Sequence, residues 1–281
     1  MIGFDIWTAP SIRSCFKNAH PQKNDSNTFK LDAAKGEFVS FQVLLRSYIN
    51  LGDNTDGENN IINISGANIS KVSGEDFEVS SIRVQAQEYI AFSDDILYPD
   101  PIANNCVVKL LPNTTQGIWV TIPVPEDQKE GEYEFKVKFE SDYEGELSAS
   151  VILNVFNVAI PKSSCAEYSM EHFTTPEDQM LLDHAGYIYK AFSDEWWVFV
   201  ERYAKSLKEC RSNICRLEIL SFLRAAGSKR IAKDKWEFNF SLLDRMIDLF
   251  VKNGVVKKFA TTDFLGSLDS GYIISPFSLS E

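Results

Sequence analysis

The first 160 residues are dominated by an alternation of apolar and polar positions, which is the period of a β-strand. Alternating runs occupy residues 82–87, 118–122, 132–140 and 147–155, and turn-forming residues fill 51–60 and 126–131. Short alternating strands separated by such turns predict an antiparallel β-sandwich. In the clearest run one face is apolar and the other is charged: Tyr133, Phe135, Val137 and Phe139 alternate with Glu132, Glu134, Lys136, Lys138 and Glu140.

The pattern changes between Pro161 and Cys165, where helical spacing replaces the alternation. A short strand over 167–173 precedes an amphipathic helix that Ser193 caps. Its apolar positions recur every three or four residues: Trp196, Val200, Tyr203, Leu207 and Cys210. The elements expected after it are a strand over 214–220, a basic loop over 223–235, a helix over 241–252 ending at Asn253-Gly254, and a strand over 255–260.

This alternation of strands and helices predicts a parallel sheet with helical crossovers. A closed eight-stranded barrel takes about 250 residues, and far fewer follow Cys165. The predicted fold class is therefore a mainly β N-terminal β-sandwich followed by an incomplete α/β (TIM-like) barrel. The predicted domains are residues 1–162 for the sandwich and residues 163–281 for the first βα units of a truncated (β/α)8 barrel.

The formal net charge of -12 narrows the classes of partner. So acidic a chain repels phosphate backbones and anionic lipid, whereas a neutral substrate meets no such repulsion. No apolar stretch approaches the length of a membrane span, so neither nucleic acid nor membrane is expected as a partner. Residues 1–10 lack the pattern of a signal peptide, which predicts a cytoplasmic chain as written and leaves a secreted parent protein open. The oligomeric state is also left open.

Metal and cofactor chemistry are not indicated by the sequence. The five cysteines are scattered and form no CxxC pair, and no cluster of histidine, cysteine and carboxylate has metal-ligand spacing. Glycine-rich phosphate loops and the GxSxG elbow of serine hydrolases are also absent from the sequence. No cofactor and no metal is therefore predicted.

Five segments together resemble glycoside hydrolase family 123, whose members join an N-terminal sandwich to a catalytic barrel and remove terminal N-acetylgalactosamine. No one segment is a catalytic signature, and the resemblance lies in their order and spacing along nearly the whole chain. The segments are "IWTAPSIRSCF" from Ile6, "LDAAKGEFVSFQVLLRS" from Leu31, "GIWVTIPVPEDQKEGEYEFKVKF" from Gly117, "SDEWWVFVERYAKSLKECRSNICRLEIL" from Ser193 and "WEFNFSLLDRMIDLFVKNGVVKKF" from Trp236.

The resemblance implies substrate-assisted retention on a glycan or glycoconjugate. In this reaction the 2-acetamido oxygen of the sugar attacks the anomeric carbon, an aspartate orients the acetamido group, and an adjacent glutamate protonates the leaving oxygen. The family places this Asp-Glu pair on the fourth barrel strand, which lies beyond residue 281. No catalytic residue is therefore predicted within the chain.

Four residues near the ends of the predicted barrel strands are candidates for contact with the sugar. Glu171 and His172 end the first strand, Glu218 lies near the end of the second, and Asp263 follows the third. Structural roles compete with sugar contact: His172 as a hydrogen-bonded histidine, Glu218 as an ion-pair partner, and Asp263 as a helix cap. Relatives often carry a histidine near the position of Asp263, which weakens that assignment.

A second function stays open from sequence alone, namely a non-catalytic carbohydrate-binding or scaffolding β-sandwich. Sugar faces pack on aromatic rings, and Trp119 lies on the opposite strand face from Ile118 and Val120. Trp196 and Trp197 lie on the predicted amphipathic helix, where packing in the core is the expected role.

Overall fold

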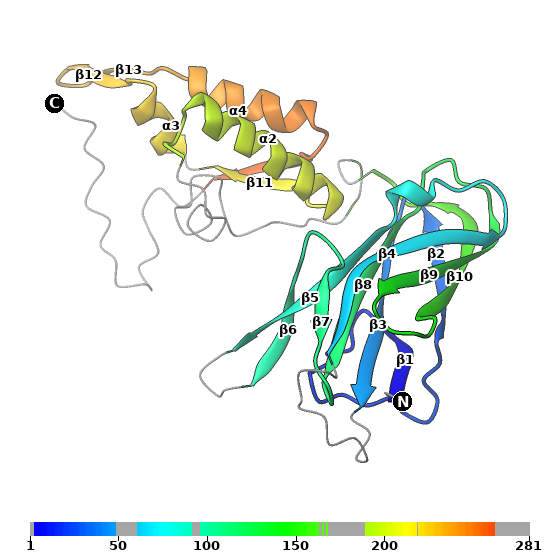
Figure 1. Ribbon diagram of the computed structural model, residues 1–281. Coiled ribbons are helices and arrows are strands. Elements are labelled where there is room, and N and C mark those ends of the chain that lie inside the picture. Colours follow the sequence, from blue (N-terminus) through cyan, green and yellow to red (C-terminus); the bar gives the residue numbers. More distant parts are fainter. Residues whose placement is uncertain are drawn as a thin grey trace. The chain divides into compact units, whose positions relative to one another are not determined.

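The computed structural model describes residues 3–48, 61–91, 96–162, 165, 167, 189–217 and 219–261. The chain divides into two compact units, Met1–Ile160 and Pro161–Glu281. The first unit consists mainly of strands, and the helices α2, α3 and α4 belong to the second (Figure 1). Each unit has a hydrophobic core of its own, as a domain does.

The described part of the first unit forms two five-stranded sheets. One sheet has the order β1 (Gly3–Pro10), β3 (Phe38–Tyr48), β8 (Thr115–Pro123), β5 (Arg83–Ala91), β6 (Leu97–Ile102). The other has the order β2 (Thr28–Lys35), β10 (Ser148–Ala159), β9 (Gly131–Ser141), β4 (Ile62–Ser73), β7 (Val108–Leu110). A single turn of 3-10 helix, η2 (Val79–Ser81), precedes β5. The β-sandwich predicted from the alternation is confirmed.

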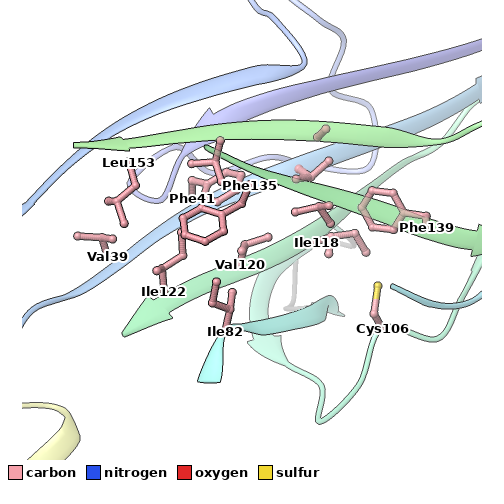
Figure 2. Packing of buried hydrophobic residues seen from close by; sticks show 14 of the residues in the cluster. Val39, Phe41, Ile82, Cys106, Ile118, Val120, Ile122, Phe135, Phe139 and Leu153 are labelled. Carbon is pink, nitrogen blue, oxygen red and sulfur yellow. The ribbon is translucent and has the colours of Figure 1, made fainter. Parts of the chain in front are cut away.

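The core lies between the two sheets (Figure 2). Phe41 and Val120 come from one sheet and Phe135 and Leu153 from the other, and all four side chains are fully buried. On β9 the four apolar positions of the predicted run are buried while the positions between them are not. Burial of one face therefore fixes the register of the strand, since a shift by one residue would put the charged face into the core.

One strand pairing departs from the antiparallel prediction. Strand β10 pairs with β2 in parallel, with Val151 opposite Phe29, and with β9 in the antiparallel sense. A hairpin can join only antiparallel neighbours, whereas β2 and β10 lie at opposite ends of the domain sequence. The long connection between them removes the restriction on their direction.

The outer face of the first sheet is covered by the segment 11–27, which we call the cover segment. Cys15 of this segment packs with Trp7 of β1 and Leu44 of β3 in a smaller apolar cluster on that face. Strand β8 is consequently buried on both faces, although the sequence pattern predicted burial only for the face of Ile118 and Val120.

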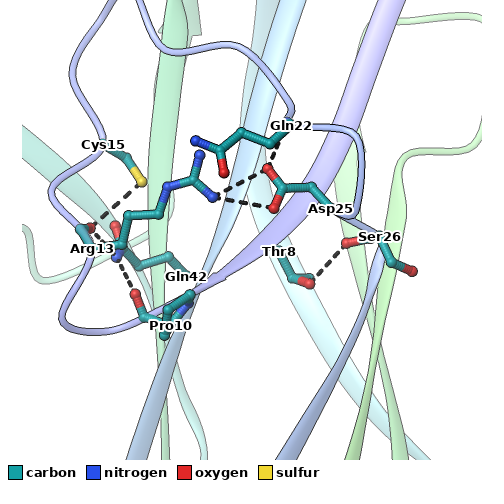
Figure 3. Close-up of polar contacts among 8 residues, drawn as sticks. All are labelled: Thr8, Pro10, Arg13, Cys15, Gln22, Asp25, Ser26 and Gln42. Carbon is teal, nitrogen blue, oxygen red and sulfur yellow. Dashed lines mark hydrogen bonds and ion pairs between the residues drawn. The ribbon is translucent and has the colours of Figure 1, made fainter.

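Polar contacts fasten the cover segment to the sheet (Figure 3). Arg13 Nη1 lies 3.1 Å from both carboxyl oxygens of Asp25, which closes the segment on itself. Gln42 Nε2, on β3, donates to the carbonyl oxygens of Pro10 and Arg13 at 2.9 and 2.8 Å. The buried glutamine thus adds hydrogen bonds to the main chain where the cover segment begins.

In the second unit the predicted first helix is confirmed as α2 (Asp194–Glu209). The Ser193 hydroxyl accepts a hydrogen bond from the main-chain N–H of Trp196 at 3.3 Å, as the capping prediction required. Trp196 and Trp197 are buried on the inner face of the helix, where core packing was the expected role. Within the described residues, no helix combines the length and the apolarity needed to cross a bilayer.

The remaining elements of the second unit follow in chain order: β11 (Ile214–Leu217), α3 (Ile219–Ala225), β12 (Lys229–Ala232), β13 (Lys235–Glu237), α4 (Ser241–Lys252) and β14 (Lys258–Thr261). Strands β11 and β14 pair in parallel, and β12 and β13 form an antiparallel hairpin. The second predicted helix is confirmed with its bounds. Gly254 follows it with a φ of 70°, the left-handed conformation that glycine adopts at low cost.

Three predictions in this unit were wrong in detail. The second strand was predicted to reach residue 220, but it ends at Leu217 because α3 begins at Ile219. The predicted loop 223–235 contains the end of α3 and the strand β12. The third strand was predicted to begin at Val255, but the N–H of this residue closes the end of α4 by donating to Phe250 O at 3.3 Å. Residues 168–173 of the first predicted strand lie outside the described residues.

Candidate functional site

The four sugar-contact candidates, Glu171, His172, Glu218 and Asp263, all lie outside the described residues. Two of them follow described strands in the sequence. Glu218 comes directly after the end of β11, and Asp263 comes two residues after the end of β14. Leu217 and Thr261, the last residues of these strands, are paired in register. The structure therefore places two strand ends at one edge of a parallel sheet, and the roles of the four candidates stay predictions.

A different site is present in the described part of the first unit. A cavity of about 800 Å³ lies beside the hairpin of β5 and β6, and we call it the hairpin cavity. Most of its functional groups are uncharged and polar, and they come from four separate stretches of sequence. The polar residues that matter below are Lys17, Gln87, Tyr89, Asn104, Asn105 and Gln116.

The cavity exists because β5 leaves β8 to pair with β6. The two strands are in register as far as the pair Ala86 and Ile118. Beyond it, side chains replace the missing main-chain partners: Gln116 Nε2 donates to Gln87 O at 2.6 Å, and Gly117 N donates to Tyr89 Oη at 3.0 Å. The main-chain groups at the point of divergence are thereby satisfied without closing the space between the strands.

Lys17 of the cover segment brings a positive charge to this space. Its Nζ donates to Gln116 Oε1 at 2.6 Å and lies 3.9 Å from the centre of the Tyr89 ring. Burial lowers the pKa of Lys17 from 10.5 to about 8, because a charged ammonium loses water there. Burial also raises the pKa of Tyr89 to about 12, so the phenol stays neutral at physiological pH.

Gln87 is the unusual group of the cavity. Its side chain is 7% exposed, and its Oε1 is buried without a hydrogen-bond partner among the described residues. A buried amide left unpaired in this way costs about 1–3 kcal/mol of stability. Gln116 is 5% exposed and by contrast makes hydrogen bonds through both its amide oxygen and its amide nitrogen.

The chemistry available in the hairpin cavity is hydrogen bonding to a ligand. Within the described residues no group of three His, Cys, Asp or Glu side chains could hold a metal ion. Trp119, the aromatic candidate from the sequence, is half-buried on β8 between Gln42 and Gln85 and does not line this cavity. Sequence reasoning did not predict the cavity, because Lys17 and Gln116 are 99 positions apart and no local pattern joins them.

Comparison with known families identifies the class of the first unit. Residues 11–141 match the glycoside hydrolase 123 N-terminal domain. The chain therefore carries an N-terminal domain of glycoside hydrolase family 123, and the resemblance seen in the sequence is confirmed. All residues that line the hairpin cavity fall within the matched range.

A family 123 glycoside hydrolase from Clostridium perfringens, described as acting on glycolipid glycans, is similar in structure, with a TM-score of 0.66 and 15% identity. The match covers 90% of this chain and 46% of the enzyme, so this chain spans about half of the enzyme's length. Spo0M, a sporulation control protein from Bacillus subtilis, matches with a TM-score of 0.28 and 10% identity, over 57% of this chain and 51% of its own. A comparison with curated proteins found no match.

Proposed function

We propose that this chain is the N-terminal part of a glycoside hydrolase that removes terminal N-acetylgalactosamine from a glycan or glycoconjugate. The observation that carries the proposal is the match of residues 11–141 to the N-terminal domain of family 123. The fold of nearly the whole chain, shared with a member of that family, supports it. Fold alone would not, because a β-sandwich serves many functions.

We assign the second unit to the beginning of a (β/α)8 barrel, over residues 163–281. The support is a parallel pair, β11 and β14, whose connection contains α4 directly before β14, as in the strand-helix-strand unit of such a barrel, with α3 and the hairpin of β12 and β13 added to it. In barrels of this kind the chemistry takes place at the carboxyl ends of the strands. Glu218 and Asp263 follow two such ends, and together with Glu171 and His172 they are our candidates for contact with the sugar.

The reaction that this proposal implies is substrate-assisted retention by an Asp-Glu pair on a later barrel strand. The adjacent Asp194 and Glu195 of this chain lie in the first turn of α2 and are not that pair. The proposed contribution of the chain is to support the barrel and to contact the sugar. It would not supply the proton of the leaving group or orient the acetamido oxygen. No cofactor is required, since the nucleophile is part of the substrate.

The test is an assay with 4-nitrophenyl N-acetyl-β-galactosaminide on the 281-residue chain and on a version extended by the in-frame residues beyond codon 281. The extended protein should release nitrophenol, and the 281-residue chain should not. Replacing the glutamate of an Asp-Glu pair in the extension with glutamine should abolish release. Turnover by the 281-residue chain, or an in-frame continuation without such a pair, would overturn the proposal.

A further inference from the structure

We infer that the hairpin cavity is a binding site for a neutral carbohydrate, which Gln87 and Lys17 hold through its hydroxyl groups. This inference needs no residue of the second unit and does not rest on the proposed hydrolytic function. It gives a location to the second function left open by the sequence, a sandwich that binds sugar. The volume of the hairpin cavity suits the inference, because cavities for small ligands measure about 300–1,000 Å³.

The first argument is the unpaired amide oxygen of Gln87. Buried polar groups in folded proteins have hydrogen-bond partners, and an exception calls for a ligand or a bound water. Gln87 Oε1 is enclosed beside Gly117, so a ligand reaches it once the Gln87 side chain turns into the cavity. The oxygen accepts, and whatever completes it there must donate a proton. A carboxylate or a phosphate dianion has no proton to donate, whereas a hydroxyl has one.

The second argument is the ammonium group of Lys17. Within the described residues it donates one hydrogen bond, to Gln116 Oε1, although an ammonium carries three protons. The group also loses water on burial, so a ligand that accepts a hydrogen bond from it would be favoured. A ligand group that both donates to Gln87 and accepts from Lys17 is a hydroxyl, and carbohydrates present several in a row.

The charge around the cavity favours a neutral ligand over an anion. Its charged residues are Lys17, Lys109 and Glu88, which sum to a single positive charge within a chain of net charge -12. The amides of Asn104 and Asn105 at its exposed rim add uncharged donors and acceptors. The single positive charge of the site would attract an anion, but the larger negative charge of the rest of the chain would repel it.

The position of Gln87 depends on Gly117. A Cβ at residue 117 would come within 2.3 Å of Gln87 Oε1, so only glycine leaves room for the amide where it lies. The backbone of Gly117 is in an ordinary conformation for strand β8, and alanine would be tolerated there once the Gln87 side chain moves. Gly117→Ala thus displaces the amide while keeping the strand.

The experiment is isothermal titration calorimetry of the full chain with N-acetylgalactosamine, lactose and cellobiose as neutral probes and glucuronate as the anionic probe. At least one neutral probe should bind, with a Kd between about 0.1 and 10 mM, and glucuronate should bind more weakly. Gln87→Met and Lys17→Met should each weaken binding by about tenfold or more, and Gly117→Ala, which displaces the amide of Gln87, should change the Kd. Lys30→Met, which alters an exposed lysine on β2, should leave the Kd unchanged.

Three results would overturn the inference: no heat from any neutral probe up to about 20 mM, tighter binding of glucuronate, or a Kd that none of the three cavity variants changes. Circular dichroism of each variant shows whether it is folded. Because Gln87→Met removes an unpaired buried polar atom, this variant should unfold at the same temperature as the unaltered chain or higher. The readout is binding, so a failure here is separate from a failure to release nitrophenol.

Discussion

At the scale of single residues, the partly buried ammonium of Lys17 ties stability to pH. Its pKa is about 8 in the folded chain and 10.5 when exposed, so the unfolded chain binds more protons between these values. The cost of burying the charge is fully present below pH 8 and disappears as the pH rises toward 10.5. Relative to Lys17→Met, the unaltered chain should therefore gain about 1–2 kcal/mol of stability between pH 7 and pH 10.

Urea unfolding of both proteins at pH 7, 8, 9 and 10 measures this difference. The comparison with a variant is needed because other groups act in the opposite direction. Burial raises the pKa of Cys106 and of Tyr89 to about 12, so the unfolded state ionises first and the folded chain loses stability above about pH 9. The loss from Cys106 is common to both proteins and cancels. Tyr89 contacts Lys17, so its loss cancels where Lys17→Met leaves the phenol buried. A difference that stays constant with pH would show that Lys17 is not desolvated.

The candidate site also illustrates what sequence can reveal at this scale. Glu171, His172, Glu218 and Asp263 were selected because they lie near strand ends in the sequence, a local property. Gln87 and Lys17 carry no local signal, since an isolated glutamine on a strand and a lysine in a loop are ordinary surface residues. Their significance comes from burial and from the divergence of β5 from β8, which only the three-dimensional fold defines.

At the scale of elements, the cap of α2 offers a direct measurement. Ser193→Ala removes the hydroxyl that accepts from Trp196 N and should cost about 1 kcal/mol. The matched control is Ser206→Ala, at an exposed position inside the same helix, where alanine is the better helix former and the change should be neutral or slightly stabilising. Hydrogen exchange of the main-chain amides of α2 measures the stability of the helix in both variants. Equal exchange in the two variants would contradict a capping role.

Elements with a strong burial pattern were the ones that sequence predicted well. Helix α4 was predicted to the residue, and β9 shows the expected alternation. The hairpin of β12 and β13 was missed because every one of its side chains is exposed, so hydrophobic periodicity carries no signal there. Helix α3 has seven residues, too few for two full turns of the pattern.

At the scale of the whole molecule, the two units differ in how complete their sheets are. The sandwich buries large side chains from both of its sheets in one continuous core. In the described part of the second unit, the parallel sheet has two strands, and each has an edge with no partner strand. Unpaired edges and small sheets are marginal in isolation. We therefore expect the second unit to unfold at lower denaturant than the sandwich.

A matched pair of core variants tests this expectation. Phe135 lies in the core of the first unit and Phe250 in that of the second, and both side chains are fully buried. Each change to alanine should cost about 3–5 kcal/mol, through lost burial and the cavity left behind. Because the cores are separate, Phe135→Ala should lower the denaturant midpoint of the sandwich alone, and Phe250→Ala that of the second unit alone.

Hydrogen exchange with peptide resolution follows the two cores separately through urea unfolding. Two transitions, each moved by one variant, would show that the sandwich is a stable domain without the second unit. A single transition moved by both variants would show that the units unfold together. In that case the chain would be one cooperative structure, and the second unit would not need further barrel strands for its stability.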